Sequence, residues 1–216
     1  MANLTLPIVR AQVLIALGTA SRFFTGSAEI HGEAEAQQTT NNNLNQIISQ
    51  GLTILNGLKP LRGEVILNLI ANKNRYDLPN TVLNIISHQW GQQQLVAFKP
   101  WQPSYPKNIP NVRYDNAGST GQAVLNPPPS SLLLNSLGSF MPLSVAQRWT
   151  ITENGDNTTV DDRNLDRVIL ACRAAAMLNI LTSRAGDPLK NQQSKNLNPQ
   201  SAYNTLMQEL NTWAMG

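Results

Sequence analysis

Residues 64–83 read EVILNLIANKNRYDLPNTVL, and this stretch decides the fold class of the chain. Residues 64–70 are rich in β-branched side chains and partly alternate between apolar and polar, which is typical of a strand. A polar turn follows, and residues 81–88 have the features of a second strand. A third strand is expected over residues 94–98, after a turn at Gly91. The sequence therefore predicts a small antiparallel β-meander.

Helical patterns lie on both sides of this region. Apolar residues recur at helical spacing over residues 5–24 and again over residues 43–57, where Asn43 is an acceptable N-cap. The polar residues 26–40 between them are expected to be irregular. After the β-region, residues 161–184 form the strongest helical pattern, and a final helix is expected over residues 199–214.

Most of the chain's prolines lie between residues 99 and 142. Proline fixes φ and removes a backbone donor, so this segment is not expected inside a central strand or a helix. We interpret it as a long, stiff arm that carries Trp101, Tyr105 and Tyr114. Aromatic side chains on such an arm suit docking against a neighbouring subunit, which makes these three the candidate interface residues. The alternative is that they hold the arm against its own domain.

A second hairpin is expected before the C-terminal helices. Residues 148–153 have a strand pattern, Asn154-Gly155 is a strong hairpin-turn dipeptide, and residues 158–160 form a short return. This hairpin closes the β-region on its C-terminal side.

The order of these elements predicts an α+β fold in three parts. Residues 1–60 supply the N-terminal helices, residues 61–160 the antiparallel β-region with its proline-rich loop over residues 99–142, and residues 161–216 the C-terminal helices. We expect the helices from the two ends of the chain to pack into one helical bundle, with the β-region inserted between them.

The composition favours an assembly component over a freely diffusing enzyme. Only 13% of the residues are charged, and asparagine and glutamine fill much of the polar surface. Amides suit wet contacts between subunits, whereas net charge keeps monomers apart. The net charge is +3, and the basic residues are spread along the middle of the chain without forming a run. Sequence-specific nucleic-acid binding is therefore not expected.

No sequence motif points to a catalytic centre. The patterns G-x-x-x-x-G-K-[ST], G-x-S-x-G and H-E-x-x-H are absent. Cys172, the single cysteine, lies in a helical segment and is expected to be a buried small apolar residue. His31 and His88 have no repeated ligand spacing, and Glu33 and Glu35 show no sign of the burial that would separate their pKa values. We expect no enzymatic activity, no catalytic residues, no metal and no cofactor.

A family resemblance rests on residues 69–83, in which a strand and a polar turn are followed by Tyr76, then Leu78-Pro79, then a second strand. This segment resembles the aromatic-x-Leu-Pro junction of the head–tail adaptor (connector) proteins of tailed bacteriophages, a family that includes the podovirus tail tubular protein. The order of elements agrees with that family's plan over most of the chain. The family often has an acid and an aromatic after Leu-Pro, where this chain has Asn80-Thr81-Val82.

The resemblance implies a structural virion protein of the neck and tail, made in the host cytoplasm. It implies a homo-oligomeric, dodecameric ring that joins the portal protein to tail proteins, with DNA passing through the lumen and no membrane contact. Many modest contacts repeated around the ring supply the affinity. Two alternatives stay open. One is another virion component, such as a tail-completion protein, and the other is a cellular protein-binding module that uses the aromatic, proline-rich loop.

Overall fold

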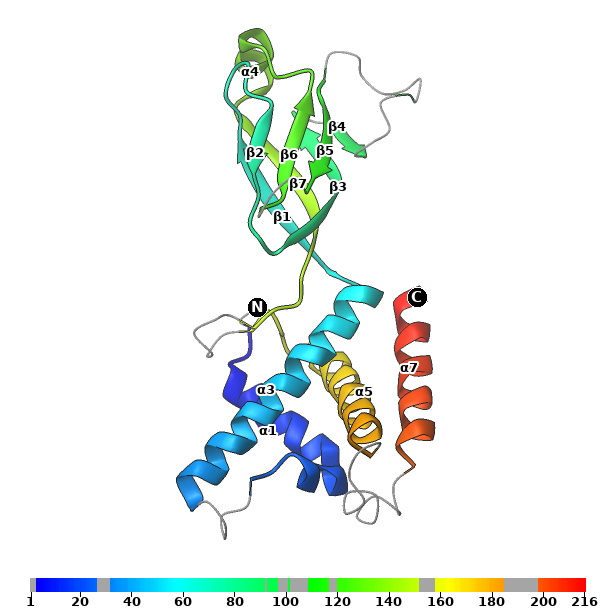
Figure 1. The fold of residues 1–216 in the computed structure, drawn as a ribbon. Coiled ribbons are helices and arrows are strands. Elements are labelled where there is room, and N and C mark those ends of the chain that lie inside the picture. The colour runs from blue at the N-terminus through cyan, green and yellow to red at the C-terminus, as the bar shows by residue number, and fades with distance from the viewer. Residues whose placement is uncertain are drawn as a thin grey trace. The chain divides into compact units, whose positions relative to one another are not determined.

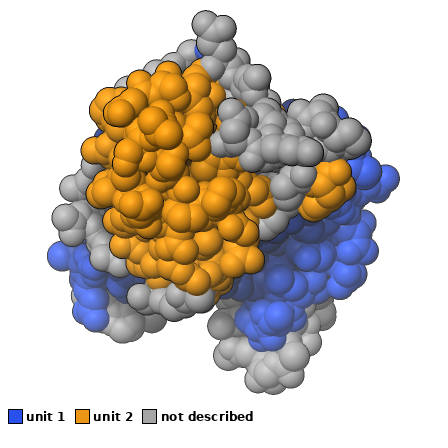
Figure 2. Space-filling model, turned by 90° about the horizontal axis from the view of Figure 1, so that it is seen from above, with its two compact units in different colours: residues 1–59, 149–216 blue, residues 60–148 orange. Residues whose placement is uncertain are grey.

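The computed structural model describes residues 3–26, 32–91, 93–96, 101, 109–116, 120–151, 158–184 and 198–216. Within these ranges the fold is mixed α+β, with five α-helices and two antiparallel sheets (Figure 1), which confirms the predicted α+β class. The chain divides into two compact units. Residues 1–59 and 149–216 form the helical unit, and residues 60–148 form the β unit (Figure 2).

The helical unit is built from both ends of the chain. Its elements are α1 (Leu6–Leu17), the 3-10 helix η1 (Gly18–Phe23), α3 (Glu33–Leu58), α5 (Leu165–Arg184) and α7 (Pro199–Met215). Helix α5 packs against α1, α3 and α7. Helices α3 and α5 approach closely at Gly51, where an added Cβ would lie 2.9 Å from the backbone N and Sγ of Cys172. The thiol therefore packs as part of the helix–helix contact.

Helix α3 begins at Glu33, ten residues before the predicted start at Asn43. The expectation of an irregular segment over residues 26–40 is therefore wrong for most of that range. Amide side chains one turn apart stabilise the polar part of the helix, because Gln37 Nε2 donates to Asn41 Oδ1 at 3.2 Å. The N-terminal part of α3 has few apolar residues, so hydrophobic spacing in the sequence does not indicate a helix there.

The β unit contains a four-stranded sheet of order β1-β7-β3-β4 and a three-stranded sheet of order β2-β6-β5. Its elements are β1 (Leu61–Asn68), β2 (Arg75–Asp77), β3 (Val82–Trp90), β4 (Gln93–Val96), β5 (Asn111–Asp115), β6 (Gln122–Asn126), α4 (Ser131–Leu137) and β7 (Phe140–Gln147). The two sheets bury one shared apolar core, to which Trp90, Leu125 and Leu143 contribute fully buried side chains.

The predicted meander is only partly correct. Strands β3 and β4 form the expected hairpin, with Gly91 at a positive φ of 67° in the turn. Strand β1 does not pair with β3, however, because β7 lies between them and pairs with both. The strand that lies between them, β7, begins at Phe140 inside the proline-rich segment and continues beyond it to Gln147.

The expectation of a long irregular arm over residues 99–142 is wrong for the described part of that range. Strands β5 and β6, helix α4 and the start of β7 all lie there, whereas residues 99–100, 102–108 and 117–119 lie outside the described residues. Pro142 even lies within β7. Pro142 faces Ile66 of β1, but the odd-numbered residues of β7 are the ones that bond to β1, so its nitrogen lies on the β3 side. The ladder between β7 and β3 ends at Leu143, and the proline therefore removes no ladder donor.

The residues that carry the family resemblance move the chain between the two sheets. Strand β1 ends in the four-stranded sheet, β2 joins the three-stranded sheet, and β3 returns to the first. Tyr76, which is buried in β2, fixes this crossing. Its Oη accepts from the backbone N–H of Ile70 at 3.0 Å and bonds to the carbonyl oxygens of Lys73 at 3.1 Å and Ile70 at 3.2 Å. The predicted strand–turn–strand segment is therefore a sheet-to-sheet crossover.

Residues 149–160, which were expected in the β-region, belong to the helical unit. Trp149 is buried, and its indole Nε1 donates to the Lys59 carbonyl oxygen at 3.0 Å. The Asn56 side chain bonds to the backbone of Trp149 on both sides, accepting from its N–H at 2.6 Å and donating to its carbonyl oxygen at 3.1 Å. The two points where the chain leaves and re-enters the helical unit are thus bonded to each other.

The predicted hairpin over residues 148–160 is represented by one isolated bridge, between Ile151 and Thr158. Its predicted turn, Asn154-Gly155, lies outside the described residues. Just before α5, Asp161 Oδ1 accepts from the Asn164 N–H at 3.0 Å, as a helix-capping side chain does.

Candidate protein-interaction surfaces

The reactive side chains that the sequence singled out and the structure describes are His88, Cys172, Glu33 and Glu35. Burial in β3 lowers the pKa of His88 to about 4, and burial in α5 raises the pKa of Cys172 to about 12, so this cysteine is a thiol at neutral pH. Glu33 and Glu35 are exposed in the first turn of α3. Across the described ranges, no group of three or more metal-binding side chains gathers. His31 lies outside them.

Two of the three candidate interface aromatics, Trp101 and Tyr114, lie within the described residues, and they differ in exposure. Trp101 is 74% exposed. Tyr114 lies in β5, packs against the core of the β unit, and donates from its hydroxyl to the Val82 carbonyl oxygen at 3.3 Å. Tyr105 lies outside the described residues. Of the two that the structure describes, Trp101 is available for contact with another molecule, and Tyr114 is held by its own unit.

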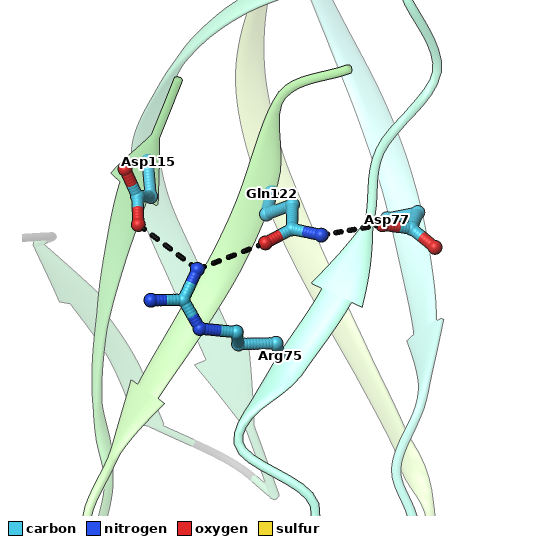
Figure 3. Close-up of polar contacts among 4 residues, drawn as sticks. All are labelled: Arg75, Asp77, Asp115 and Gln122. Atoms are coloured by element: carbon cyan, nitrogen blue, oxygen red, sulfur yellow. Dashed lines mark hydrogen bonds and ion pairs between the residues drawn. The ribbon is translucent and has the colours of Figure 1, made fainter. Parts of the chain in front are cut away.

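The outer face of the three-stranded sheet carries a row of polar side chains that are hydrogen-bonded within the sheet, called the polar row below (Figure 3). Asp77, Gln122 and Asp115 are register partners across β2, β6 and β5. Arg75 Nη1 donates to Asp115 Oδ2 at 3.1 Å and to Gln122 Oε1 at 3.0 Å, and Gln122 Nε2 donates to Asp77 Oδ1 at 2.7 Å. Each charged group in this row therefore has a partner within the same sheet.

The outer face of the four-stranded sheet is different in character. The side chains of Arg62, Glu64 and Ile66 on β1 are exposed there, Ile66 by 61%, and Phe140 on the neighbouring β7 is 64% exposed. A hollow of about 440 Å³ opens on β1, β7 and β3. Its lining combines charged, polar and apolar residues: Arg62, Gly63, Glu64, Ser87, His88, Gln89, Pro142 and Ser144. Neither Arg62 nor Glu64 forms an ion pair with another described residue.

Strand β1 is also an open edge. It is eight residues long and, among the described strands, pairs with β7 alone. The N–H of Leu69 donates to the Ser139 carbonyl oxygen at 2.7 Å, in register with the ladder. Because backbone direction alternates along a strand, the odd-numbered residues of β1 turn their N–H and C=O groups toward β7. The even-numbered residues, including Arg62, Glu64 and Ile66, turn theirs away from the sheet.

A second surface feature, in the helical unit, was not found from the sequence. The ring of Trp213 in α7 has two cations over it, with Lys59 Nζ at 5.2 Å and the guanidinium carbon of Arg167 at 5.7 Å from the ring centroid. A hollow of about 530 Å³ opens beside it, lined in part by Arg167 and Trp213. Since these three residues lie in widely separated parts of the chain, no local pattern predicts their contact.

The helical unit also exposes apolar side chains. Ile8 and Ile15 are 46% and 73% exposed on α1, and their spacing of seven residues places them on one face. None of the described helices has both the length and the apolar character that crossing a bilayer requires.

Comparison with known proteins finds no family model that matches the chain and no match to a curated protein.

Proposed function

We propose that the chain is a structural virion protein of the head–tail adaptor type. In this proposal, copies form a homo-oligomeric ring that joins the portal protein to tail proteins and lets DNA pass through the lumen. The observation that carries the proposal is the arrangement of the chain: helices from both ends form one unit, and the β unit between Lys59 and Trp149 contains the Tyr76-x-Leu78-Pro79 segment. The ring stays dodecameric in this proposal, and its location is the neck and tail of the virion.

The packing of the helical unit supports this plan. Helix α5 lies against α1, α3 and α7, and we propose that these helices are the bundle of the adaptor plan. The close approach at Gly51 and Cys172 and the two-sided bonding of Asn56 to Trp149 hold the helical unit together. A subunit in a ring needs such a firmly packed unit, because each contact must keep its geometry while the neighbours bind.

The exposed apolar side chains support a contact role. Trp101, Ile66 and Phe140 in the β unit and Ile15 in the helical unit are each more than half exposed. Large apolar groups at this exposure are the kind that become buried when subunits meet. We propose that Trp101, with Tyr105, contacts a neighbouring subunit or a tail protein.

The charge distribution fits a subunit that lies near DNA without reading its sequence. The β unit contains seven lysines and arginines against three aspartates and glutamates, and the helical unit contains nine against ten. The excess of positive charge thus belongs to the β unit. A modest, spread charge of this kind attracts phosphates weakly and non-specifically.

Light scattering on a sizing column, combined with negative-stain microscopy, tests the proposal. The purified chain is measured alone and with the portal protein encoded in the same genome. Ring-shaped particles, or a stable complex with the portal, are the expected result. A chain that stays monomeric in both conditions contradicts the proposal.

A pair of variants locates the contact. Trp101→Ala is expected to reduce ring or complex formation at least tenfold while the circular-dichroism spectrum stays unchanged, because the indole is exposed. Tyr114→Phe is the matched control. Its hydroxyl bonds within the β unit, so assembly should be unaffected.

A further inference from the structure

We propose that β1 is a docking edge for a second copy of this chain, which pairs β1 with β1 in antiparallel order about a twofold axis at Gly63. This contact is isologous, whereas the contacts that close a ring are heterologous. The inference therefore goes beyond the proposed function and does not rest on it.

The backbone of β1 supplies the first argument. The N–H and C=O groups of Arg62, Glu64 and Ile66 point away from β7, and within the described residues nothing pairs with them. A long open edge is a template for strand pairing unless proline, a bulge or charged side chains, lysine above all, oppose the pairing. The residues of β1 include neither proline nor lysine, and its ladder with β7 runs without a register shift.

The side chains supply the second argument, which identifies the occupant. Arg62 and Glu64 are two residues apart, so both lie on the outer face of the sheet. In an antiparallel pair centred on Gly63, Arg62 lies directly opposite Glu64 of the second copy, and Glu64 lies opposite its Arg62. Opposite charges at directly opposed positions stabilise a strand pair. The edge is therefore complementary in charge to itself, and the twofold axis uses each complementary pair twice.

The same register also gives a suitable partner to Ile66, the next outward-bonding position along β1. Ile66 falls opposite Pro60 of the second copy, so an exposed apolar side chain meets another apolar residue. Proline has no N–H, but its carbonyl oxygen can accept from the N–H of Ile66. The pairing joins two four-stranded sheets into one continuous sheet of eight strands, in the order β4-β3-β7-β1-β1-β7-β3-β4.

Charge exchange tests the pairing. In Arg62→Glu both positions are acidic, and in Glu64→Arg both are basic, so each variant places like charges opposite each other. Each is expected to raise the dimer dissociation constant about tenfold in sedimentation equilibrium. An equimolar mixture of the two variants restores complementarity and should form heterodimers. The double variant Arg62→Glu/Glu64→Arg should form dimers like the unchanged chain.

Arg113→Glu is the control, since Arg113 is exposed on the three-stranded sheet and the substitution makes the same charge change. It should leave the dissociation constant unchanged. A monomeric unchanged chain, or single variants that dimerise as well as it does, overturns the proposal. Ring formation that continues while these variants dimerise normally would leave the proposed function standing and remove this inference alone.

Cysteine cross-linking tests the register. In a Cys172→Ala background, Arg62→Cys protein mixed with Glu64→Cys protein should form an intermolecular disulfide under mild oxidation, because the two positions are directly opposed. Each protein alone should form it at least tenfold more slowly. Faster cross-linking of Glu64→Cys with itself would place the axis at residue 64 and overturn the proposed register.

Discussion

The two sheets of the β unit share one core but treat their outer polar groups in opposite ways. On the three-stranded sheet, Arg75 donates to both Asp115 and Gln122. On the four-stranded sheet, Arg62 and Glu64 are exposed, and neither forms an ion pair with a described residue. The polar groups of the first face are already bonded within their own sheet. The second face has charged groups and an open strand edge that another molecule can contact. The difference indicates where the β unit makes its contacts.

The largest predicted effect is on the free energy of unfolding, and it tests whether the two sheets contribute equally to the shared core. Leu143 in β7 and Leu125 in β6 are both fully buried in the shared core. Each Leu→Ala substitution is expected to lower the free energy of unfolding by about 2–5 kcal/mol, because it removes buried methyl groups and leaves a cavity. Urea unfolding followed by circular dichroism measures this. A cost that is large on one sheet and negligible on the other would show that the core is not shared equally.

The second prediction concerns pH and the hollow on the four-stranded sheet. Burial lowers the pKa of His88 from 6.5 to about 4, so the unfolded chain binds this proton more readily than the folded chain. Burial of the neutral imidazole therefore costs almost no stability above pH 6.5, and it destabilises the folded chain increasingly as the pH falls from 6.5 toward 4. Between pH 7 and 5 the loss should be about 2 kcal/mol. The charged residues Arg62 and Glu64 line the same hollow.

Urea unfolding of the unchanged chain and of His88→Gln at pH 7 and pH 5 isolates this contribution. The variant should lack about 2 kcal/mol of the pH dependence. Equal pH dependence in the two proteins would show that His88 does not hold a lowered pKa.

The third prediction sharpens the contrast between the outer faces. Gln122→Ala removes two hydrogen bonds of the polar row and should lower the free energy of unfolding by about 0.5–1.5 kcal/mol. Ser144→Ala, on the outer face of the four-stranded sheet, is the matched control and should change it by less than about 0.5 kcal/mol. Equal costs at the two positions would mean that the polar row adds nothing to stability.

The smallest predicted effect on folding is at the exposed apolar positions of the four-stranded sheet. Ile66→Ser and Phe140→Ser should each change the free energy of unfolding by less than about 0.5 kcal/mol, because their side chains are mostly in solvent. Both should weaken self-association in light scattering. A loss of several kcal/mol on unfolding would show that these residues belong to the chain's own core.

Local patterns were sufficient to predict the fold class and most of the helices. The Asn198 and Pro199 start of α7 and the turn at Gly91 depend on neighbouring residues, which a sequence displays directly. The early start of α3 at Glu33 was missed because amide pairs such as Gln37 and Asn41 stabilise a helix without an apolar pattern.

The sheet order could not be predicted for a different reason. Pro142 argued against a strand, yet it lies where the ladder between β7 and β3 has already ended. Whether a proline costs a hydrogen bond depends on the partner strand, which local sequence does not identify. The charges of Arg62 and Glu64 are visible in the sequence, but their significance depends on β1 being an edge.

The bonding of Trp149 to Asn56 and Lys59 has a consequence for how this protein can be altered. In the helical unit, Trp149, where the chain re-enters, is bonded to Asn56 and Lys59, where the chain leaves. In the β unit, Leu61 and Gln147, which lie near its first and last residues, are direct register partners. The chain therefore leaves and re-enters the helical unit at neighbouring points, and the β unit begins and ends at neighbouring points. Residues 60–148 form a cassette that recombination can exchange as one piece, and a short linker between Lys59 and Trp149 could close the remaining chain.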